Sequence, residues 1–236
     1  MLEKSGVLGG KLNFSRQVPF KRDLCKFMDY LIHMVEKTGV EVRLNTEATV
    51  ELVESLEPDV VIAAVGAKAL VPPIPGVDGA NVITAEEAYR KVKAGEDIGK
   101  KIAVLGGGDV GCETAVYLAQ EAGKEVSLVE MTDTLAAASC TIPRTAITKE
   151  IEKCVDAHTG ARCTGITKDG ITYVDAQGEH SIQADTVVLS AGMVPQKAQA
   201  EAFRMIAGEF FPIGDCVKAN NVRTAVRTGY DSAIQL

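Results

Sequence analysis

The sequence lacks tryptophan, has few histidines and has no closely paired cysteines. Its 236 residues include no Trp, three His and six Cys, and no two cysteines are spaced C-x-x-C. A cysteine-rich metal site or a redox dithiol is therefore poorly supported, and we expect neither. Scattered cysteines favour a reduced, cytoplasmic setting. No apolar run approaches the roughly 18 residues that a membrane-spanning helix needs, so we expect no membrane partner.

Concentrated positive charge is also missing. The net charge is -7 and no block of Lys or Arg occurs. Without such a block, neither nucleic acid nor an acidic membrane surface is an expected partner. The hydrophobic fraction of 46% is typical of a globular protein, and the length allows one large domain or two ordinary ones. Composition leaves both a monomer and an oligomer open.

The apolar residues predict strands that alternate with helices. Apolar runs at 59–66 and 185–192 are typical of parallel strands buried on both faces, and 101–105 is expected to be a strand before a glycine turn. Apolar residues at helical spacing predict a helix over 20–38, and we expect that stripe to belong to the core. Short segments over 161–183 indicate a small antiparallel meander. Further expected elements are a strand over 40–44, a helix over 145–156 and a last helix from 221. This order predicts an α/β fold with parallel sheets.

The two halves of the chain resemble each other. The similar pairs are LEKSGVLGG (2–10) with VEMTDTLAA (129–137), TGVEVRL (38–44) with TGARCTG (159–165), and DVVIAAVG (59–66) with DTVVLSAG (185–192). We interpret them as one supersecondary unit used twice, with chance similarity as the alternative. In the second copy Glu130 follows a strand, a glycine turn and a helix, whereas nothing comparable precedes Glu3. We therefore expect the first copy to lack its first strand and helix, as in a fragment of a longer protein.

The segment GGGDVG carries the clearest motif. It places Gly106, Gly108 and Gly111 in a G-x-G-x-x-G pattern between a predicted strand and a predicted helix. These glycines allow a tight turn, a close approach of pyrophosphate and close helix–strand packing. Phosphates would then meet the free N–H groups at the helix start, beside Asp109. Glu130 ends the next strand and would accept hydrogen bonds from an adenosine ribose. The motif predicts a dinucleotide site, with a purely structural turn as the alternative.

The same acid bears on the choice of nicotinamide cofactor. A ribose 2′-phosphate beside Glu130 would be repelled, and no Arg follows until Arg144. We therefore favour NADH over NADPH. Glu113 lies just beyond the glycines and could stand near the nicotinamide end of the cofactor. Its alternative role is a favourable charge near the start of a helix.

These features resemble the two-dinucleotide-binding flavoprotein reductases. The closer resemblance is to the C-terminal part of the NADH:flavin oxidoreductase family, which includes 2,4-dienoyl-CoA reductase and trimethylamine dehydrogenase. The similar blocks are LEKSGVLGGKLNF, FMDYLIHMVEKTGVEVRLNTEAT, DVVIAAVGAKALVPPIPG, GGGDVGCE and FPIGDC. The resemblance covers essentially the whole chain. It implies two nested Rossmann-like domains, a truncated FAD or ADP domain over 1–77 plus 205–236 and an inserted NAD(P)H domain over 78–204.

The resemblance also implies roles for residues of the first domain. Glu3 would bind the ribose of FAD or ADP, and Gly10 and Lys11 would lie along its pyrophosphate or flavin. Gly66 stands at the glycine of the family's A-T-G motif, although Val65 replaces the Thr. The first G-x-G-x-x-G of the family is absent from this chain, which puts flavin binding by the chain alone in question.

Three further positions match family motifs. Gly214 and Asp215 match a Gly-Asp pair whose acid holds the flavin ribityl or the ADP phosphates. Gly192 matches the turn that returns the chain from the NAD(P)H domain, with Pro195 three residues later.

The function implied by this resemblance is redox transfer by cofactors. Hydride would pass from NADH to the flavin, and electrons would leave for an N-terminal barrel that holds FMN and an iron–sulfur cluster and is absent here. No side chain need act as acid or base, so we expect no catalytic residue. The alternatives are an ADP- and NAD-binding module without hydride transfer, a pyridine nucleotide-disulphide-type reductase, and a regulatory NAD sensor.

Overall fold

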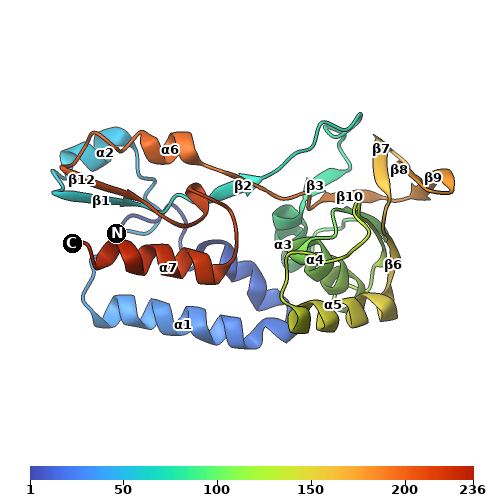
Figure 1. The fold of residues 1–236 in the computed structure, drawn as a ribbon, viewed down its shortest axis with the longest axis horizontal. Helices are drawn as coiled ribbons and strands as arrows, with labels where there is room; N and C mark the ends of the chain where they lie inside the picture. Colours follow the sequence, from blue (N-terminus) through green and yellow to red (C-terminus); the bar gives the residue numbers. More distant parts are fainter. The chain divides into compact units, whose positions relative to one another are not determined.

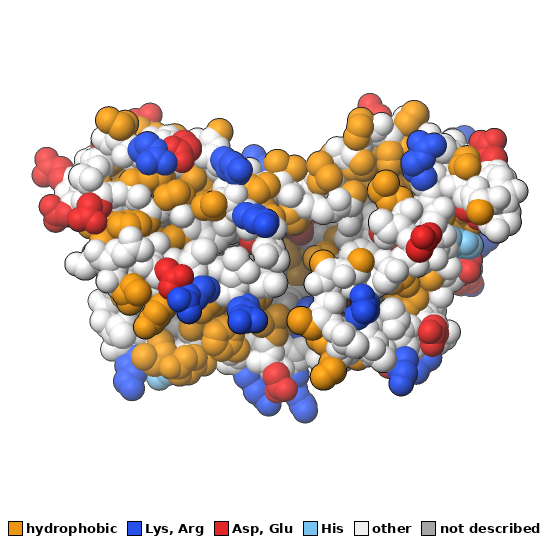
Figure 2. Space-filling model, viewed as in Figure 1, with side chains coloured by type: hydrophobic (Ala, Val, Ile, Leu, Met, Phe, Trp, Pro, Cys, Tyr) orange, Lys and Arg blue, Asp and Glu red, His pale blue; other side chains and the backbone are white. Residues whose placement is uncertain are grey.

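The computed structural model describes residues 1–236, apart from the side chain of Pro19. The chain forms two compact units (Figure 1). Unit 1 consists of Met1–Lys68 and Met193–Leu236, and unit 2 of Ala69–Gly192. The domain limits expected from sequence, after residues 77 and 204, lie further along the chain than this division and stay predictions. None of the described helices is long and apolar enough to cross a membrane. Acidic and basic side chains are interspersed on the face shown in Figure 2.

Unit 2 is built on a five-stranded sheet with the order β3-β10-β4-β5-β6. All four neighbouring pairs are parallel. The strands are β3 (Val82–Thr84), β4 (Lys101–Leu105), β5 (Glu125–Val129), β6 (Val155–His158) and β10 (Thr186–Leu189). All four residues of β10 are buried, as the apolar run predicted for a parallel strand covered on both faces.

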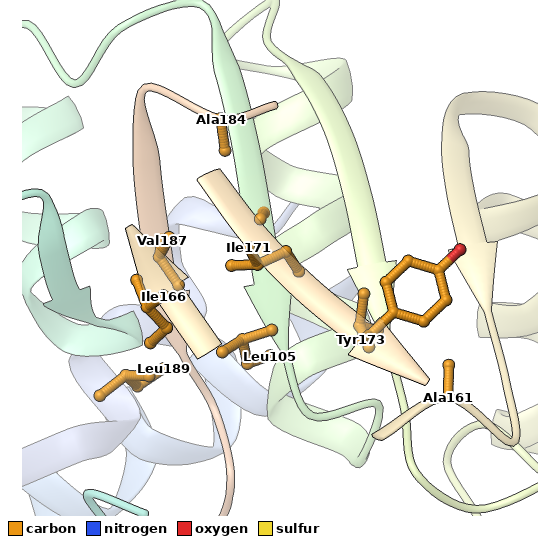
Figure 3. Packing of buried hydrophobic residues seen from close by; sticks show 10 residues of the cluster. Leu105, Ala161, Ile166, Ile171, Tyr173, Ala184, Val187 and Leu189 are labelled. Carbon is orange, nitrogen blue, oxygen red and sulfur yellow. The ribbon is translucent and has the colours of Figure 1, made fainter. Parts of the chain in front are cut away.

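Helices and a small second sheet cover the two faces of this sheet. Helices α3 (Ala85–Lys93), α4 (Asp109–Gln120) and α5 (Thr141–Cys154) pack against its strands. The antiparallel meander consists of β7 (Arg162–Thr167), β8 (Gly170–Asp175) and β9 (Gly178–Gln183). Leu105 and Leu189 of the sheet share a buried cluster with Ile166 and Ile171 of the meander (Figure 3). The predicted meander is confirmed, and it forms the second layer of this core.

Unit 1 contains a smaller parallel pair, β1 (Val60–Ala63) with β12 (Glu209–Pro212). Strands β2 (Ala67–Ala69) and β11 (Met193–Pro195) form another pair. The helices are α1 (Arg22–Lys37), α2 (Val50–Ser55), α6 (Lys197–Glu201) and α7 (Val222–Ala233). Single 3-10 turns or short 3-10 helices cover Gly10–Gln17, Pro19–Lys21 and Gly214–Cys216. Ala63 of β1 packs with Phe203 and Cys216 in the core of this unit.

Three expectations from sequence were wrong in detail. The α-helix begins at Arg22, so Phe20 lies before it in a 3-10 turn and is 49% exposed. Within α1 only Met28 is buried and Phe27 is 37% exposed, so the apolar stripe is core only in part. The strand expected over 40–44 is reduced to one bridge between Arg43 and Leu2. The helix expected to reach residue 156 ends at Cys154, because the next four residues pair with β5 as strand β6.

In unit 1, hydrogen bonds join the segment around Glu3 to residues 43–46. The Glu3 N–H donates to the carbonyl of Arg43 at 3.0 Å, and the Glu3 carbonyl accepts from the Thr46 N–H at 2.9 Å. The Asn45 N–H donates to the carbonyl of Ser5 at 2.9 Å. The Glu3 carboxylate accepts the Ser5 N–H at 2.8 Å. Four bonds thus fix a strand end and the loop that follows it.

The same four bonds recur in unit 2. The Glu130 N–H donates to the carbonyl of His158, and the Glu130 carbonyl accepts from the Ala161 N–H, both at 2.9 Å. The Gly160 N–H donates to the carbonyl of Thr132 at 2.9 Å. The Glu130 carboxylate accepts the Thr132 N–H at 2.7 Å. The repeat is therefore present in the backbone, with Glu3 at the place of Glu130.

The structure corrects the register of one matched pair of segments. The sequence comparison paired residues 38–44 with 159–165. The hydrogen bonds instead make Arg43 of unit 1 the equivalent of His158 of unit 2, because each accepts the N–H of the loop glutamate. The match of β1 with β10 agrees with the sequence comparison, since both are parallel strands and their apolar sequences are similar. Apolar character alone could not separate neighbouring registers in a segment this short.

Sheet order shows which part of the repeat unit 1 lacks. In unit 2, β10 pairs with β3 on one side and with β4 on the other. In unit 1, the pair β1–β12 corresponds to the pair β10–β3 of unit 2. The bridge between Leu2 and Arg43 corresponds to the pair β5–β6. Among the described residues, no strand of unit 1 takes the place of β4. The described part of unit 1 thus contains no counterpart of β4, and the expectation that the chain is a fragment of a longer protein stays a prediction.

Candidate functional site

The glycine turn of unit 2 joins buried strand β4 to helix α4. Gly106 has φ of +104°, and a Cβ there would lie 2.4 Å from the Ser190 carbonyl oxygen. A Cβ on Gly111 would lie 1.8 Å from the Gly106 carbonyl oxygen. Only glycine fits at either position, because both contacts are with main chain. The turn and the close helix packing predicted for these two residues are confirmed.

Gly108 precedes the first turn of α4 and faces open space. A Cβ at this position would meet nothing within 4 Å, so the glycine is not required by the fold. The free N–H groups of α4 begin here, and such groups bind phosphate oxygens. Asp109 follows, and its carboxylate accepts a 2.6 Å hydrogen bond from the Ser139 hydroxyl. The open side of Gly108 fits a pyrophosphate, while Asp109 ties the helix start to a neighbouring loop.

Glu130 lies at the end of β5 and is 9% exposed. One carboxylate oxygen accepts the Gly107 N–H at 2.6 Å. The other accepts the N–H and the hydroxyl of Thr132 at 2.7 and 2.8 Å. A buried carboxylate with three donors is held in one orientation. Glu130 therefore joins the glycine turn to the loop after β5, and its remaining lone pairs can meet a ribose diol.

Gly107 is a site residue that the motif did not single out. A Cβ on Gly107 would lie 2.5 Å from Leu135 Cδ2 and 2.8 Å from Glu130 Cβ. Its carbonyl accepts the Ala136 N–H at 2.7 Å. The signal available in the sequence was the unbroken run of three glycines, one more than the pattern needs. The extra glycine lets the Glu130 carboxylate reach the backbone of the turn.

Glu113 lies on α4, and its charge contributes to raising the pKa of two nearby groups, Cys112 and Tyr89. Burial, with smaller contributions from the charges of Asp109, Glu113 and Glu130, raises the pKa of Cys112 to about 12. The Cys112 thiol donates to the Gly107 carbonyl at 3.2 Å and supports the turn from behind. Burial, with a smaller contribution from Glu113, also raises the pKa of Tyr89. A position for Glu113 at the nicotinamide end stays a prediction.

Gly192 lies beyond the same edge of the sheet as the glycine turn. Strand β10 ends at Leu189, which stands in register with Leu105 at the end of β4. The Ser190 N–H donates to the Leu105 carbonyl at 2.8 Å. Gly192 has φ of +117°, and its carbonyl accepts the Leu70 N–H at 2.9 Å. Parallel sheets bind ligands at this carboxyl edge, where the structure places Gly106 and Gly192 together.

The predicted residues of the first site lie on unit 1. Gly66 follows β1 with φ of +75°, and Gly214 follows β12 with φ of +64°. Since β1 and β12 are parallel neighbours, these glycines share the carboxyl edge of that pair. The Gly214 N–H donates to the Thr228 hydroxyl oxygen at 2.9 Å. The Asp215 carboxylate accepts the Asn220 N–H at 3.2 Å.

Gly10 and Lys11 begin the short 3-10 helix of unit 1. Gly10 has φ of +51°, and a Cβ there would meet nothing within 4 Å. Partial burial and the charge of Lys4 lower the pKa of Lys11, while Asp215 acts in the opposite direction. The charge of Asp215 thus acts on Lys11. The sequence motifs predicted these two residues separately as parts of the first nucleotide site.

The two units differ in how well they fit a nucleotide. Unit 2 combines the carboxylate, the glycine turn and the helix start in one parallel sheet, which is the set that a dinucleotide needs. Unit 1 has the carboxylate of Glu3 and the glycines of the carboxyl edge, but among its described residues no glycine turn follows a strand at the place of β4. No group of three or more candidate metal ligands is found in the part of the chain that the structure describes. The fold and the glycine turn define a Rossmann-like dinucleotide-binding fold.

The comparison with protein families agrees. The family model described as pyridine nucleotide-disulphide oxidoreductase matches residues 29–227, so the chain belongs to this family. Members are oxidoreductases that bind FAD and NAD(P)H. The six cysteines of this chain are all free thiols.

Named relatives match the chain over its whole length. Bilirubin reductase of Mediterraneibacter gnavus is 33% identical over 235 residues, which cover 99% of this chain and 36% of that protein. NADH oxidase of Thermoanaerobacter brockii is 33% identical over 242 residues, covering 100% of this chain and 37% of the relative. A solved complex of 2-naphthoyl-CoA reductase has a TM-score of 0.93 and 28% identity, and it covers 100% of this chain and 36% of that chain. The chain therefore spans little more than a third of the length of these proteins.

Proposed function

We propose that this chain is the nucleotide-binding part of an NADH:flavin oxidoreductase related to 2,4-dienoyl-CoA reductase. The observation that supports this most directly is the Glu130 carboxylate bonded to the Gly107 N–H at 2.6 Å, beside the open face of Gly108. When bound, the nicotinamide supplies a hydride and the flavin accepts it. The chain's own residues orient these groups: Glu130 holds the adenosine ribose and the start of α4 holds the pyrophosphate.

NADH, rather than NADPH, is the proposed cofactor of unit 2. Glu130 would oppose a 2′-phosphate by charge repulsion and by the lack of a hydrogen-bond donor. Met131, next in the loop, is 68% exposed and carries no charge that would bind a phosphate. One of the relatives is named an NADH oxidase, which supports the same choice.

Unit 1 is proposed to bind FAD or ADP once a further strand and helix complete its sheet. The support is the sheet order, in which β1 has only β12 as its partner while the equivalent β10 has two. We propose that this strand and helix, and a barrel with FMN and an iron–sulfur cluster, belong to the longer protein in which the chain works. The share of 36–37% that the chain covers in its relatives is consistent with such an arrangement.

The visible spectrum tests this proposal. The purified chain is mixed with FAD, desalted, and then reduced with NADH under anaerobic conditions. A retained flavin band that bleaches with NADH supports hydride transfer within the chain. A colourless chain that binds NADH in a titration supports the role of unit 2, and it is the result expected if unit 1 needs a further strand and helix to hold FAD. A chain that binds neither nucleotide contradicts the proposal. Bound flavin that NADH fails to reduce would instead favour a nucleotide-binding module without hydride transfer.

A further inference from the structure

The loop that carries Glu130 depends on a turn from a later part of unit 2. Residues 130–132 form three main-chain hydrogen bonds with the turn 158–161, each 2.9 Å long. They run from Glu130 to His158, from Ala161 to Glu130 and from Gly160 to Thr132. Any movement of this turn therefore moves the carboxylate that we assign to the adenosine ribose. We call residues 130–132 the ribose loop.

A side-chain hydrogen bond between His158 and Tyr173 connects the 158–161 turn to the meander. The Tyr173 hydroxyl lies 3.1 Å from His158 Nδ1, and His158 Nε2 lies 3.1 Å from an Asp156 carboxylate oxygen. With neutral His158, the tyrosine donates to Nδ1 and Nε2–H donates to Asp156. Both ring nitrogens of His158 are thus engaged, and the ring is fixed at the end of β6.

Tyr173 is well placed to hold this position. Its side chain belongs to the buried cluster of unit 2 and is 5% exposed. Figure 3 shows its ring beside Ala161, with the hydroxyl directed away from the rest of the cluster. The ring also stacks on His180 at 5.1 Å between centroids, and His180 Nε2 lies 2.9 Å from an Asp175 oxygen. One face of the ring is thus supported by the meander, so its hydroxyl has little freedom to move.

Unit 1 offers an internal comparison. Arg43 occupies the position of His158, and Arg43 Nε lies 2.8 Å from Glu41 Oε1, as His158 lies near Asp156. In both units, the residue whose carbonyl accepts the N–H of the loop glutamate also contacts an acidic side chain two residues earlier in the chain. The contact with a buried tyrosine is an addition of unit 2, where the glycine turn and the loop glutamate are both present.

We infer that Tyr173 and His158 are positioning residues of the dinucleotide site and fix the ribose loop through the 158–161 turn. The inference rests on the proposed function of unit 2. It restricts their effect to the adenosine half of the cofactor, because Glu130 is the group that they hold. Neither residue bonds to the glycine turn directly, and the one link to it described above is the bond from the Gly107 N–H to Glu130. The nicotinamide contacts should therefore be independent of them.

The test uses Tyr173→Phe in the full 236-residue chain. This change removes one hydroxyl and keeps the ring, the stacking and the core volume. Thr164→Val is the matched control, because it removes a cross-strand hydroxyl contact of 3.0 Å with Thr172 in the same meander. Dissociation constants are measured for NADH, for ADP-ribose, which contains the adenosine ribose, and for reduced nicotinamide mononucleotide, which lacks it.

We expect Tyr173→Phe to weaken NADH and ADP-ribose by about three- to tenfold, the effect of one neutral hydrogen bond. Binding of the mononucleotide should stay unchanged, and Thr164→Val should bind all three ligands as the unmodified chain does. Equal losses for all three ligands, or equal losses in the two variants, would mean a general effect on stability and would overturn the inference. An unmodified chain that binds NADH, with a Tyr173→Phe variant that binds it equally well, would overturn the inference alone. An unmodified chain that binds none of the ligands would overturn the proposed function as well.

Amide hydrogen exchange without any ligand gives a second readout. Exchange reports local opening of hydrogen-bonded segments. Tyr173→Phe should speed exchange in peptides that contain residues 130–132 and 158–161 and leave peptides of α4 unchanged. Unchanged exchange in the ribose loop would contradict the coupling, whatever the ligand measurements give.

Discussion

At the scale of single residues, Glu130 has two tasks that sequence motifs merge into one. Its carboxylate accepts three hydrogen bonds from Gly107 and Thr132, which order the loop in the absence of any ligand. It is also the acid expected to meet the ribose. A carboxylate that is already fixed by the protein loses little freedom when the ligand arrives, which favours binding.

Replacing Glu130 with Gln therefore should harm binding more than removal of a ligand contact alone. The amide NH₂ of Gln would face at least one of the three donors, so a bond would be lost and a donor left without its acceptor. We expect NADH affinity to fall by about tenfold or more, at a cost of roughly 1–3 kcal/mol. Isothermal titration calorimetry measures it. Glu152→Gln, at an exposed glutamate of α5, is the control and should bind normally.

Two glycines of the turn should separate folding from binding. Gly108→Ala places its Cβ in open space with φ of -68°, so thermal stability should be unchanged while NADH binding weakens by about tenfold, because the pyrophosphate needs that space. Gly111→Ala places its Cβ 1.8 Å from a carbonyl oxygen and should destabilise unit 2 by about 1–3 kcal/mol. Thermal melts and NADH titrations of both variants check this. Equal stability of the two variants would contradict the structure.

At the scale of elements, sequence patterns predicted strands and helices where one segment carried its own signal. Strand β4 lies at its expected position, and helix α4 begins within the glycine motif as expected. Strand β6 was missed because Val155–His158 is a strand only through its pairing with β5. Gly107 and the ties of the ribose loop were missed for a similar reason, since they depend on contacts between segments far apart in sequence.

The capping box of α3 gives a prediction with a pH dependence. Thr84 Oγ accepts the Glu87 N–H at 3.2 Å, and the Glu87 carboxylate accepts the Thr84 N–H at 2.7 Å. The bond to the Thr84 N–H lowers the pKa of Glu87. Because the pKa is lower in the folded than in the unfolded chain, its stabilisation is present above the ordinary glutamate pKa and is lost as the pH falls through the lowered value.

Urea unfolding followed by circular dichroism tests both halves of this box. Thr84→Ala should cost about 1 kcal/mol at neutral pH. Glu87→Gln should also destabilise the chain at neutral pH, and its difference from the unmodified chain should vanish in acid. A Glu87→Gln difference that is independent of pH would contradict the assigned role of the carboxylate.

At the scale of the whole molecule, the two units share the hydrogen-bonding pattern of one loop but differ in their sheets. Glu3 and Glu130 occupy equivalent loops with four equivalent hydrogen bonds, but only Glu130 has a glycine turn to bind. The repeat could be recognised from sequence because the apolar runs of β1 and β10 have the same character. Its register at Arg43 and His158 could not, since only main-chain pairing distinguishes one position from the next.

The central claim is that unit 2 binds NADH through the glycine turn and Glu130. The chain contains no Trp, so NADH fluorescence can be titrated without background from that residue. The account predicts a saturable change with one NADH per chain, in the absence of flavin, that is much weakened in Gly108→Ala and in Glu130→Gln. Absence of binding by the unmodified chain, or variants that bind NADH as tightly as the unmodified chain does, would contradict it.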